Sequence, residues 1–366
     1  MTVPSTTSAT DASQAGRYLL RPAQATDLAG LLRLASQRAI GISSLPLERE
    51  ALHERILSSV QAFASDDAPS GDETYLFVLE DRAAGGELIG TAGIAAAAGF
   101  HDRFYAYRNE FVVQASPALG ARNRIHTLHL CHDLTGVTLL TGFHIQASHA
   151  HTLAPQLLSR GRLMFIAAHP ERFSDRIAAE NPGIADDKGR CPFWDAVGRR
   201  FFGMDTAAAE ALAGGRTHKN WIAELLPQSP IYVPLLPEEA QWSLGQLHPV
   251  GELPFGILMD EGFDGDNYVN VFDGGPTADS RVALLKTVAS RRRVRASARR
   301  GEAGPLQGWQ LVTRPARVDF RATLLPRGTG RSLALAADEA QALGVAAGDW
   351  LDVAPLDLAA GAEATA

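Results

Sequence analysis

Histidine is the side chain best suited to proton transfer near neutral pH, and one histidine of this sequence has a distinctive setting. His248 lies in Gly245-Gln-Leu-His-Pro249, directly after a predicted helix and in front of a proline that restricts the backbone. A neutral imidazole titrates at about pH 6.5, so it can donate or accept a proton at physiological pH. The pattern is compatible with a catalytic proton donor or with a hydrogen-bonding loop residue.

A second group of histidines, His126, His129 and His132, recurs at every third residue. On a helix this spacing would place possible metal ligands along one face. The apolar residues between them are typical of a strand, on which residues three apart point to opposite sides. We therefore expect a strand here and no metal site.

Several well-known catalytic motifs are absent from the sequence. It contains no Gly-x-Ser-x-Gly nucleophile motif, no Gly-x-x-x-x-Gly-Lys phosphate loop and no His-Glu-x-x-His zinc motif. Their absence argues against a hydrolase, an NTPase and a zinc protease of those types.

Composition narrows the class of protein further. The 366 residues include 34 Lys and Arg and 41 Asp and Glu, a formal net charge of -7, which offers no electrostatic basis for binding nucleic acid. No apolar run reaches the roughly 20 residues of a membrane span. Cys131 and Cys191 form no Cys-x-x-Cys pair. We expect a reduced, cytoplasmic protein that binds neither nucleic acid nor membrane.

The elements that would position the chemistry centre on a strand–loop–helix unit. An apolar strand ends at Ile145, a polar loop covers 146–155, and apolar spacing predicts a helix over Thr152–Ala168. Many acyl-CoA-dependent N-acyltransferases hold their thioester at such a unit. Glycines in that loop normally let backbone N–H groups and the helix N-terminus approach the pyrophosphate, but this loop contains no glycine.

The elements before and after this unit support the same fold class. A strand over 18–22, helices from Leu28 and over 47–64, and a hairpin of 75–79 with 88–94 follow the order of the acyl-CoA N-acyltransferase fold. Further along, the pattern predicts strands over 104–113 and 176–180, helices over 193–202, 206–212 and 238–244, and a strand end over 221–226. The expected class is α+β, with a GNAT-like mixed central sheet flanked by helices.

Changes in composition divide the chain into regions. We expect a disordered leader over 1–16, a GNAT-like N-acyltransferase domain over 17–276 and a linker over 277–304 that contains a basic run. Short apolar runs alternating with turns predict a β-rich C-terminal subdomain over 305–358, followed by a disordered tail over 359–366.

Taken together, ordered motifs resemble those of the arginine N-succinyltransferase family, and within it the alpha-subunit type. The resemblance covers about Tyr18 to Arg293 and, more loosely, the tail through Leu356. The stretches that carry it are Ser43-Ser-Leu-Pro46, Tyr107-Arg-Asn109, Leu130-Cys-His-Asp-Leu-Thr-Gly136, Ser159-Arg-Gly-Arg162, His169-Pro-Glu-Arg-Phe173, Pro192-Phe-Trp194, Gly245-Gln-Leu-His-Pro249 and Phe272-Asp-Gly-Gly-Pro276.

The resemblance implies an acyltransferase of arginine catabolism. Members transfer succinyl from the co-substrate succinyl-CoA to the α-amine of L-arginine or L-ornithine, with no permanently bound cofactor. The family's proton donor falls on His248, and a succinyl-CoA contact falls on Phe143, where the family more often has leucine. A homologous beta subunit is the expected partner, and self-association is left open.

Substrate recognition is assigned here from charge alone. The substrate carboxylate requires a cation such as Arg108, and its cationic end requires an acid such as Glu224 or Asp273. A turn role for Asp273 is the alternative.

The loop departs from the family pattern, and this leaves two functions open. Typical single-chain members and the beta subunit carry a glycine-bearing loop, such as Gly-Asn-Gly, where this chain has Leu153-Ala154-Pro155. Losing two charge-assisted hydrogen bonds of roughly 1.5–3 kcal/mol each would weaken CoA binding by a factor of about 10² or more. The chain is therefore expected to be either a catalytic succinyltransferase subunit or a non-catalytic partner that stabilises or regulates a CoA-binding beta subunit.

Overall fold

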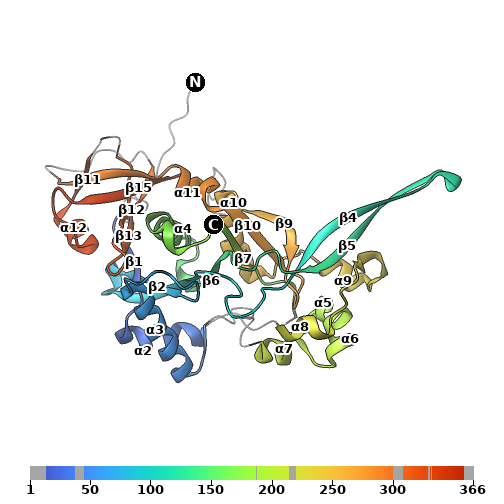
Figure 1. Ribbon diagram of the computed structural model, residues 1–366. Coiled ribbons are helices and arrows are strands. Elements are labelled where there is room, and N and C mark those ends of the chain that lie inside the picture. Colours follow the sequence, from blue (N-terminus) through green and yellow to red (C-terminus); the bar gives the residue numbers. More distant parts are fainter. Residues whose placement is uncertain are drawn as a thin grey trace.

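The computed structural model describes residues 14–37, 45–186, 188–213, 220–299, 308–328, 330 and 332–357. Within these residues one 15-stranded sheet runs through the molecule in the order β14-β11-β15-β12-β13-β1-β2-β3-β6-β7-β10-β9-β4-β5-β8 (Figure 1). The strands are β1 (Tyr18–Pro22), β2 (Thr74–Asp81), β3 (Glu87–Ala95), β4 (Ala106–Ser116), β5 (Ala121–Cys131), β6 (Thr138–Ile145), β7 (Arg176–Glu180), β8 (Ile231–Tyr232), β9 (Asp264–Val269), β10 (Pro276–Arg281), β11 (Arg292–Ala298), β12 (Trp309–Arg314), β13 (Arg321–Pro326), β14 (Ser332–Leu335) and β15 (Trp350–Leu356). Parallel β6–β7 and β11–β14 pairs among antiparallel ones confirm a mixed sheet.

Helices cover both faces of the sheet around β2. The helices of the described residues are α2 (Leu28–Ser36), α3 (Arg49–Ala64), α4 (Ala154–Ala168), α5 (Pro192–Ala196), α6 (Gly198–Phe202), α7 (Thr206–Leu212), α8 (Asn220–Leu225), α9 (Glu238–Ser243), α10 (Glu252–Glu261), α11 (Lys286–Ala289) and α12 (Ala337–Leu343). Because side chains alternate along a strand, Phe77 of β2 faces the core around α4, whereas Leu76 and Val78 face α2 and α3. Burial on both faces explains why β2 is an almost continuous apolar run.

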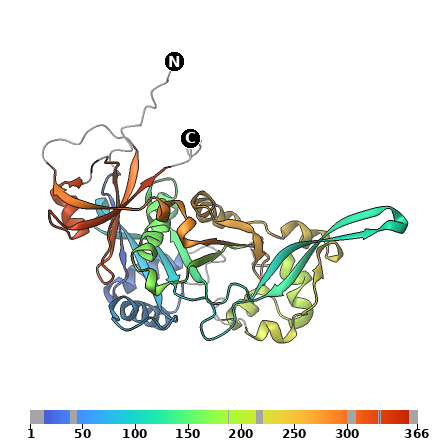
Figure 2. The same ribbon diagram turned by 45° about the horizontal axis from the view of Figure 1, so that its top comes forward.

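Helix α4 is the centre of the larger core. Its residues Leu157, Leu158, Met164 and Phe165 are buried, and the helix contacts β1, β3, β6, β12 and β13. Figure 2 shows α4 between the C-terminal strands and the middle of the sheet. The predicted strand–loop–helix unit is confirmed as β6, a connecting loop and α4.

A second core lies beneath β4, β5 and β9. Phe193, Trp194 and Phe272 pack there with Tyr107 and with Ile222 of α8. Beyond this lobe, β4 and β5 continue as a two-stranded arm that projects away from the body (Figures 1 and 2).

The C-terminal part differs from the expected arrangement of a linker and a separate subdomain. Residues 277–304 include most of β10, all of α11 and all of β11, and the described C-terminal strands join the main sheet where Leu20 of β1 pairs with Ala322 of β13. Two arginines of the basic run are paired, since Arg291 and Arg293 both form ion pairs with Asp352. Residues 1–13 of the expected leader and all of the expected tail lie outside the described residues. Residues 14–16 of the leader are described, and they contact the body of the molecule.

Two local predictions are wrong. The strand end expected over 221–226 is helix α8, because Ile222 and Leu226, one helical turn apart, are both buried in the second core. The single helix expected over 193–202 breaks at Val197 into α5 and α6. The break lets the Trp194 ring lie over Gly198, where a Cβ would be only 2.3 Å from the ring. Among the described residues, no helix is long and apolar enough to cross a membrane.

Candidate active site

The site begins at an irregularity in β6. The register of β3 with β6 places Gly142 and Phe143 together opposite the single residue Ala92, which is a β-bulge. Gly142 has a φ of 61°, a left-handed conformation that glycine adopts without strain. A bulge takes backbone groups of the extra residue out of the ladder, so this strand can offer an N–H group to a ligand.

On its other side β6 separates from β7. The two strands run parallel and pair only from Thr138 to Leu140. After β7 the chain forms an isolated bridge between Gly183 and Leu247 instead. A cavity of about 650 Å³ lies at this separation, a volume typical of ligand pockets, and Phe143 is part of its wall.

The loop that carries His248 is attached to the opposite side of this cavity. The His248 N–H donates to Pro182 O at 2.9 Å, and Pro182, Val250 and Gly251 all line the cavity, although His248 itself is not among the lining residues. The Val250 N–H donates to His248 Nδ1 at 3.3 Å. Because Nδ1 accepts this bond, the neutral ring carries its proton on Nε2, which is the nitrogen that could donate it.

Asp273 belongs to the turn that supports this loop. Its Oδ1 accepts the Gly275 N–H at 2.9 Å, and the carboxylate is buried and is not part of the cavity wall. The same turn holds the loop, because the Gly245 N–H donates to Gly274 O at 2.8 Å. Gly183 permits this packing, since a Cβ there would lie 2.4 Å from Asp273 O. Asp273 thus contributes to positioning His248 through the backbone.

The N-terminus of α4 is closed by the chain itself. The Leu153 N–H donates to Gln14 Oε1 at 3.0 Å, and the Ala154 N–H donates to Thr152 Oγ1 at 3.1 Å. Pro155 has no N–H to offer. At this end of the helix the N–H groups of Leu153 and Ala154 are therefore already satisfied, and Pro155 provides none.

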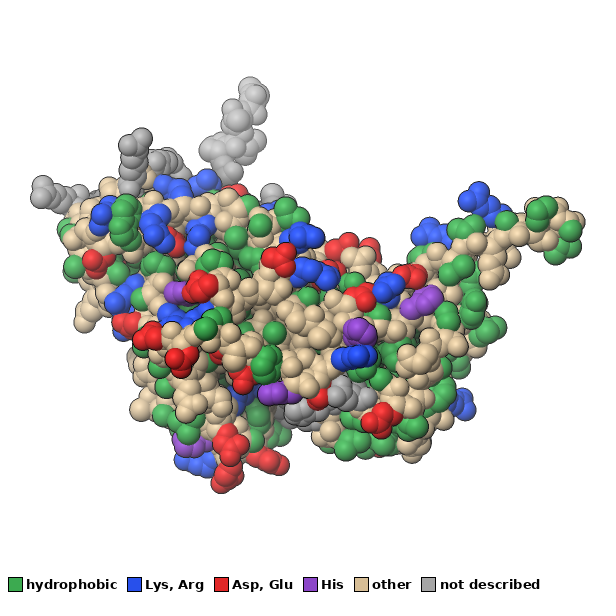
Figure 3. All heavy atoms as spheres, viewed as in Figure 1, with side chains coloured by type: hydrophobic (Ala, Val, Ile, Leu, Met, Phe, Trp, Pro, Cys, Tyr) green, Lys and Arg blue, Asp and Glu red, His purple; other side chains and the backbone are tan. Residues whose placement is uncertain are grey.

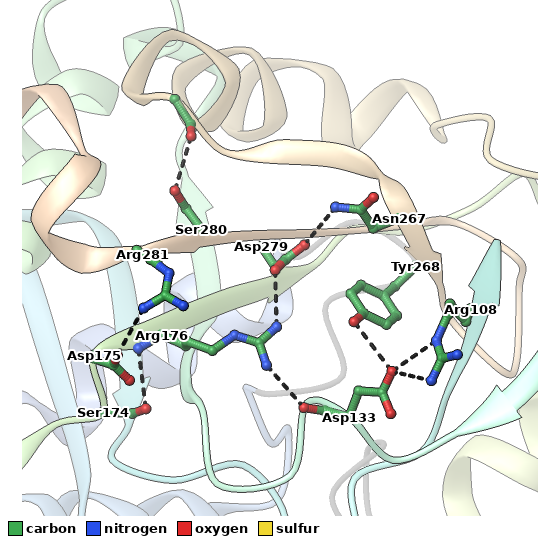
Figure 4. A network of polar contacts seen from close by, with 11 residues as sticks. Arg108, Asp133, Ser174, Asp175, Arg176, Asn267, Tyr268, Asp279, Ser280 and Arg281 are labelled. Atoms are coloured by element: carbon green, nitrogen blue, oxygen red, sulfur yellow. Dashed lines mark hydrogen bonds and ion pairs between the residues drawn. The ribbon is translucent and has the colours of Figure 1, made fainter. Parts of the chain in front are cut away.

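Arg108 lies apart from the cavity, on β4. Its guanidinium forms an ion pair with Asp133 at 2.6 Å (Figure 4) and another with Glu110 at 3.1 Å. Figure 4 also shows Tyr268 and Arg176 directed toward Asp133, so Arg108 belongs to a polar network between β4, β7 and β9. These carboxylates raise the pKa of Arg108 by hydrogen bonding to its charged form.

The remaining predicted residues are also distant from Phe143. Glu224 is exposed on α8 and does not line the cavity. His126 and His129 lie on β5 as expected for a strand, and His126 contacts Asn109 through Nε2. No group of three or more metal-ligating side chains occurs within the described part of the chain. The structure therefore brings together Phe143 and the His248 loop, but neither Arg108 nor Glu224.

Comparison with known proteins identifies the family. A family model described as arginine N-succinyltransferase beta subunit matches residues 18–287. The chain belongs to the arginine N-succinyltransferase family. Arginine N-succinyltransferase subunit alpha of Pseudomonas aeruginosa is 46% identical over 90% of this chain and 97% of that relative. Subunit beta of the same organism is 38% identical over 74% of this chain and 78% of its own length.

A solved structure extends the match to three dimensions. Arginine/ornithine succinyltransferase subunit AI from Pseudomonas aeruginosa superimposes with a TM-score of 0.83 at 43% identity, and the match covers 93% of this chain and 99% of that one. The resemblance inferred from the motifs of the arginine N-succinyltransferase family is confirmed.

Two residues of the cavity wall of this protein were not identified from the sequence. Arg55 of α3 and Arg162 of α4 line the cavity together with Phe143. Arg162 lies within Ser159-Arg-Gly-Arg162, which served only as a family motif. The sequence did offer a signal for Arg162, because it lies on the apolar face of a predicted core helix. A buried arginine requires a partner, which can be a ligand.

Proposed function

We propose that this chain is the alpha subunit of an arginine/ornithine N-succinyltransferase, which moves the succinyl group of succinyl-CoA to the α-amine of L-arginine or L-ornithine. The observation that supports this most directly is the cavity between the bulge at Phe143 and the His248 loop, in a chain of this family. The parallel strands that separate after Leu140, followed by α4, also support a GNAT-like fold.

The proposed reaction uses the two sides of the cavity differently. The α-ammonium group of the acceptor first loses a proton to solvent, and its nitrogen then attacks the thioester carbon. A backbone N–H at the bulge near Phe143 stabilises the oxyanion. When the tetrahedral intermediate collapses, the C–S bond breaks and His248 gives its Nε2 proton to the departing thiolate. The nitrogen of the intermediate releases its extra proton, which restores the proton on His248, and the amide and free CoA leave.

A second candidate function is a non-catalytic partner subunit. The observation that favours it is the closed N-terminus of α4, where Gln14 and Thr152 occupy backbone donors that could otherwise bind the CoA pyrophosphate. In this alternative, a homologous beta subunit binds CoA and this chain stabilises or regulates it.

Isothermal titration and an activity assay separate the two candidates. The purified chain is titrated with CoA, and then assayed alone and with its beta subunit for thiol release from succinyl-CoA in the presence of L-arginine. The catalytic proposal predicts submillimolar CoA binding and arginine-dependent thiol release. Absence of CoA binding below millimolar concentration, with activity confined to the beta subunit, would establish the partner role instead.

The projecting arm supports a heteromeric assembly with a beta subunit. Phe111, Val113 and Leu119 are apolar side chains of the arm with exposed fractions of 48%, 53% and 81%. Hydrophobic side chains are visible toward its end in Figure 3. An isolated two-stranded ribbon is marginally stable in water, so a partner that covers these side chains would stabilise it. Light scattering of the co-expressed subunits measures whether the assembly forms.

The compartment is proposed from the cysteines. Cys131 and Cys191 are both buried and neither forms a disulfide bond, which supports a reducing environment such as the cytoplasm.

A further inference from the structure

Two guanidinium groups from different helices meet in the wall of the cavity. Arg162 of α4 is only 3% exposed, and its Nη1 donates to Gly93 O at 3.1 Å and to Thr141 O at 3.3 Å. Arg55 of α3 approaches the same point, because a Cβ built on Gly93 would lie 3.7 Å from Arg55 Nη2. Both cationic side chains therefore lie beside β3 at Gly93.

The positive charge of this pair has no direct counterion among the described residues, although the carboxylates of Glu54, Asp72, Asp102 and Glu180 also line the cavity. Neither Arg55 nor Arg162 forms an ion pair with a described carboxylate, and Arg55 Nε is buried without a hydrogen-bond partner. Arg160, on the same helix as Arg162, shows the usual solution, since it pairs with buried Glu261 at 3.0 Å. Isolated buried charges are costly, so an uncompensated pair inside a cavity indicates a site for an anion.

Burial has the expected effect on both groups without neutralising them. Desolvation lowers the pKa of Arg55 to about 10 and that of Arg162 to about 9. Both guanidiniums therefore remain charged at neutral pH. The planar guanidinium fork matches the geometry of carboxylate and phosphate groups, which it can bind through two parallel hydrogen bonds.

We infer that Arg55 and Arg162 form a carboxylate subsite of the cavity and that it holds the distal carboxylate of the succinyl group. This inference rests on the proposed function. The position of the two arginines supports the acyl group as the source of the carboxylate. The Arg162 guanidinium lies 5.9 Å from the centre of the Phe143 ring and donates a hydrogen bond to Thr141, the residue directly before the bulge. The α-carboxylate of the amino-acid acceptor is the other source of the same chemistry.

Such a subsite gives the enzyme a physical reason to prefer a dicarboxylate acyl donor. An acyl chain of equal length that ends in a methyl group would leave both guanidiniums unpaired in the cavity. Sites built to pair a polar group reject analogues that lack it, because their own buried groups then lose their partners.

The test compares succinyl-CoA with butyryl-CoA, in which a methyl group replaces the carboxylate. Dissociation constants are measured for the assembled alpha–beta complex without acceptor, so that no transfer occurs. Arg55→Gln should weaken succinyl-CoA binding at least about tenfold and change butyryl-CoA binding less than about twofold. Arg49→Gln, at an exposed position of the same helix, is the matched control and should leave both constants unchanged.

A second variant guards against misfolding and tests geometry. Arg162→Lys keeps the charge but loses the fork and part of its bonding to Gly93 and Thr141, so it should also reduce the preference for succinyl-CoA over butyryl-CoA. Equal weakening of both acyl-CoA ligands by Arg55→Gln would overturn the inference. The acceptor is tested with L-arginine and agmatine, its decarboxylated analogue. A selective loss of L-arginine binding, with succinyl-CoA unaffected, would overturn the assignment to the succinyl group and give the subsite to the acceptor.

Binding of free succinate separates this inference from the proposed function. Saturation-transfer NMR with succinate and butyrate needs no transfer reaction. If the complex transfers no succinyl group but binds succinate in an Arg55-dependent manner, the proposed function fails and the subsite stands. If transfer is intact but Arg55→Gln affects neither succinate nor succinyl-CoA, the subsite fails and the proposed function stands.

Discussion

His248 is the residue on which the proposed chemistry can be tested most directly. Replacing it with alanine removes the proton donor to the thiolate, so turnover of the complete enzyme should fall at least about tenfold. The KM for succinyl-CoA should change much less, because His248 acts on the thiolate only in the transition state. Steady-state kinetics of the assembled complex measure both constants.

The matched control for His248→Ala is His132→Ala, which removes an exposed histidine outside that cavity. It should leave turnover unchanged. Unchanged turnover in His248→Ala would remove this imidazole from the mechanism. Thermal unfolding of both variants distinguishes a catalytic loss from a folding defect, since the Val250 N–H loses its acceptor when His248 is replaced.

At the level of elements, the sequence predicted the helices and strands that have strong local patterns. It missed the features that depend on packing between residues far apart in the sequence. The strand–loop–helix unit was predictable because β6 and α4 carry clear periodicity. The bulge at Gly142 was not, since it depends on the register with β3. Helix α8 was missed because two prolines after Leu226 suggested a turn, whereas burial of Ile222 decides the structure. Arg108 was a reasonable cation, but pairing across strands brings it to Asp133 instead of the cavity.

The β4–β5 arm is the element whose role is most accessible to mutation. The double variant Val113→Glu/Leu119→Glu places charges on its exposed apolar side chains, so it should prevent association with the beta subunit. Size-exclusion chromatography with light scattering should then report separate subunits. The melting temperature of the chain alone should stay within a few degrees of the original, because both side chains are exposed.

Gln114→Glu is the control for the arm, because it adds a charge at an exposed polar position of β4 in the same arm. It should assemble normally. An alpha–beta complex that still forms with the double variant would exclude the apolar surface of the arm as the contact.

For the whole molecule, the continuous sheet explains why distant regions contribute to one cavity. Strands β3 and β6 supply its inner wall, α3 supplies Arg55, and the chain after β7 joins the His248 loop to the second core. No single segment of the sequence contains the site. The pairing of β1 with β13 also ties the C-terminal strands to this body. Composition alone suggested a separate subdomain because it cannot reveal a pairing between strands so far apart in the sequence.

Stability of the whole molecule should depend on pH through one buried and two partly buried histidines. Burial lowers the pKa of His126, His144 and His169 below the ordinary value, because it disfavours the charged imidazolium. Below about pH 6.5 the unfolded chain therefore binds more protons at these residues than the folded chain does. The free energy of unfolding must then decrease as the pH falls through that range.

Urea unfolding at about pH 7.5 and pH 5.5 measures this effect, and the prediction is a lower unfolding midpoint at the acidic pH. This pH range isolates the effect of histidine. Burial raises the pKa of Asp81, but the hydrogen bond and charge of Arg17 outweigh burial and hold that pKa below the usual range. The contribution of Asp81 to stability is therefore lost only at lower pH. His144→Gln removes a buried ring whose Nε2 has no hydrogen-bond partner, and it should reduce the difference between the two midpoints. His132→Ala should not reduce this difference. A midpoint that rises on acidification would contradict the lowered pKa of these three histidines.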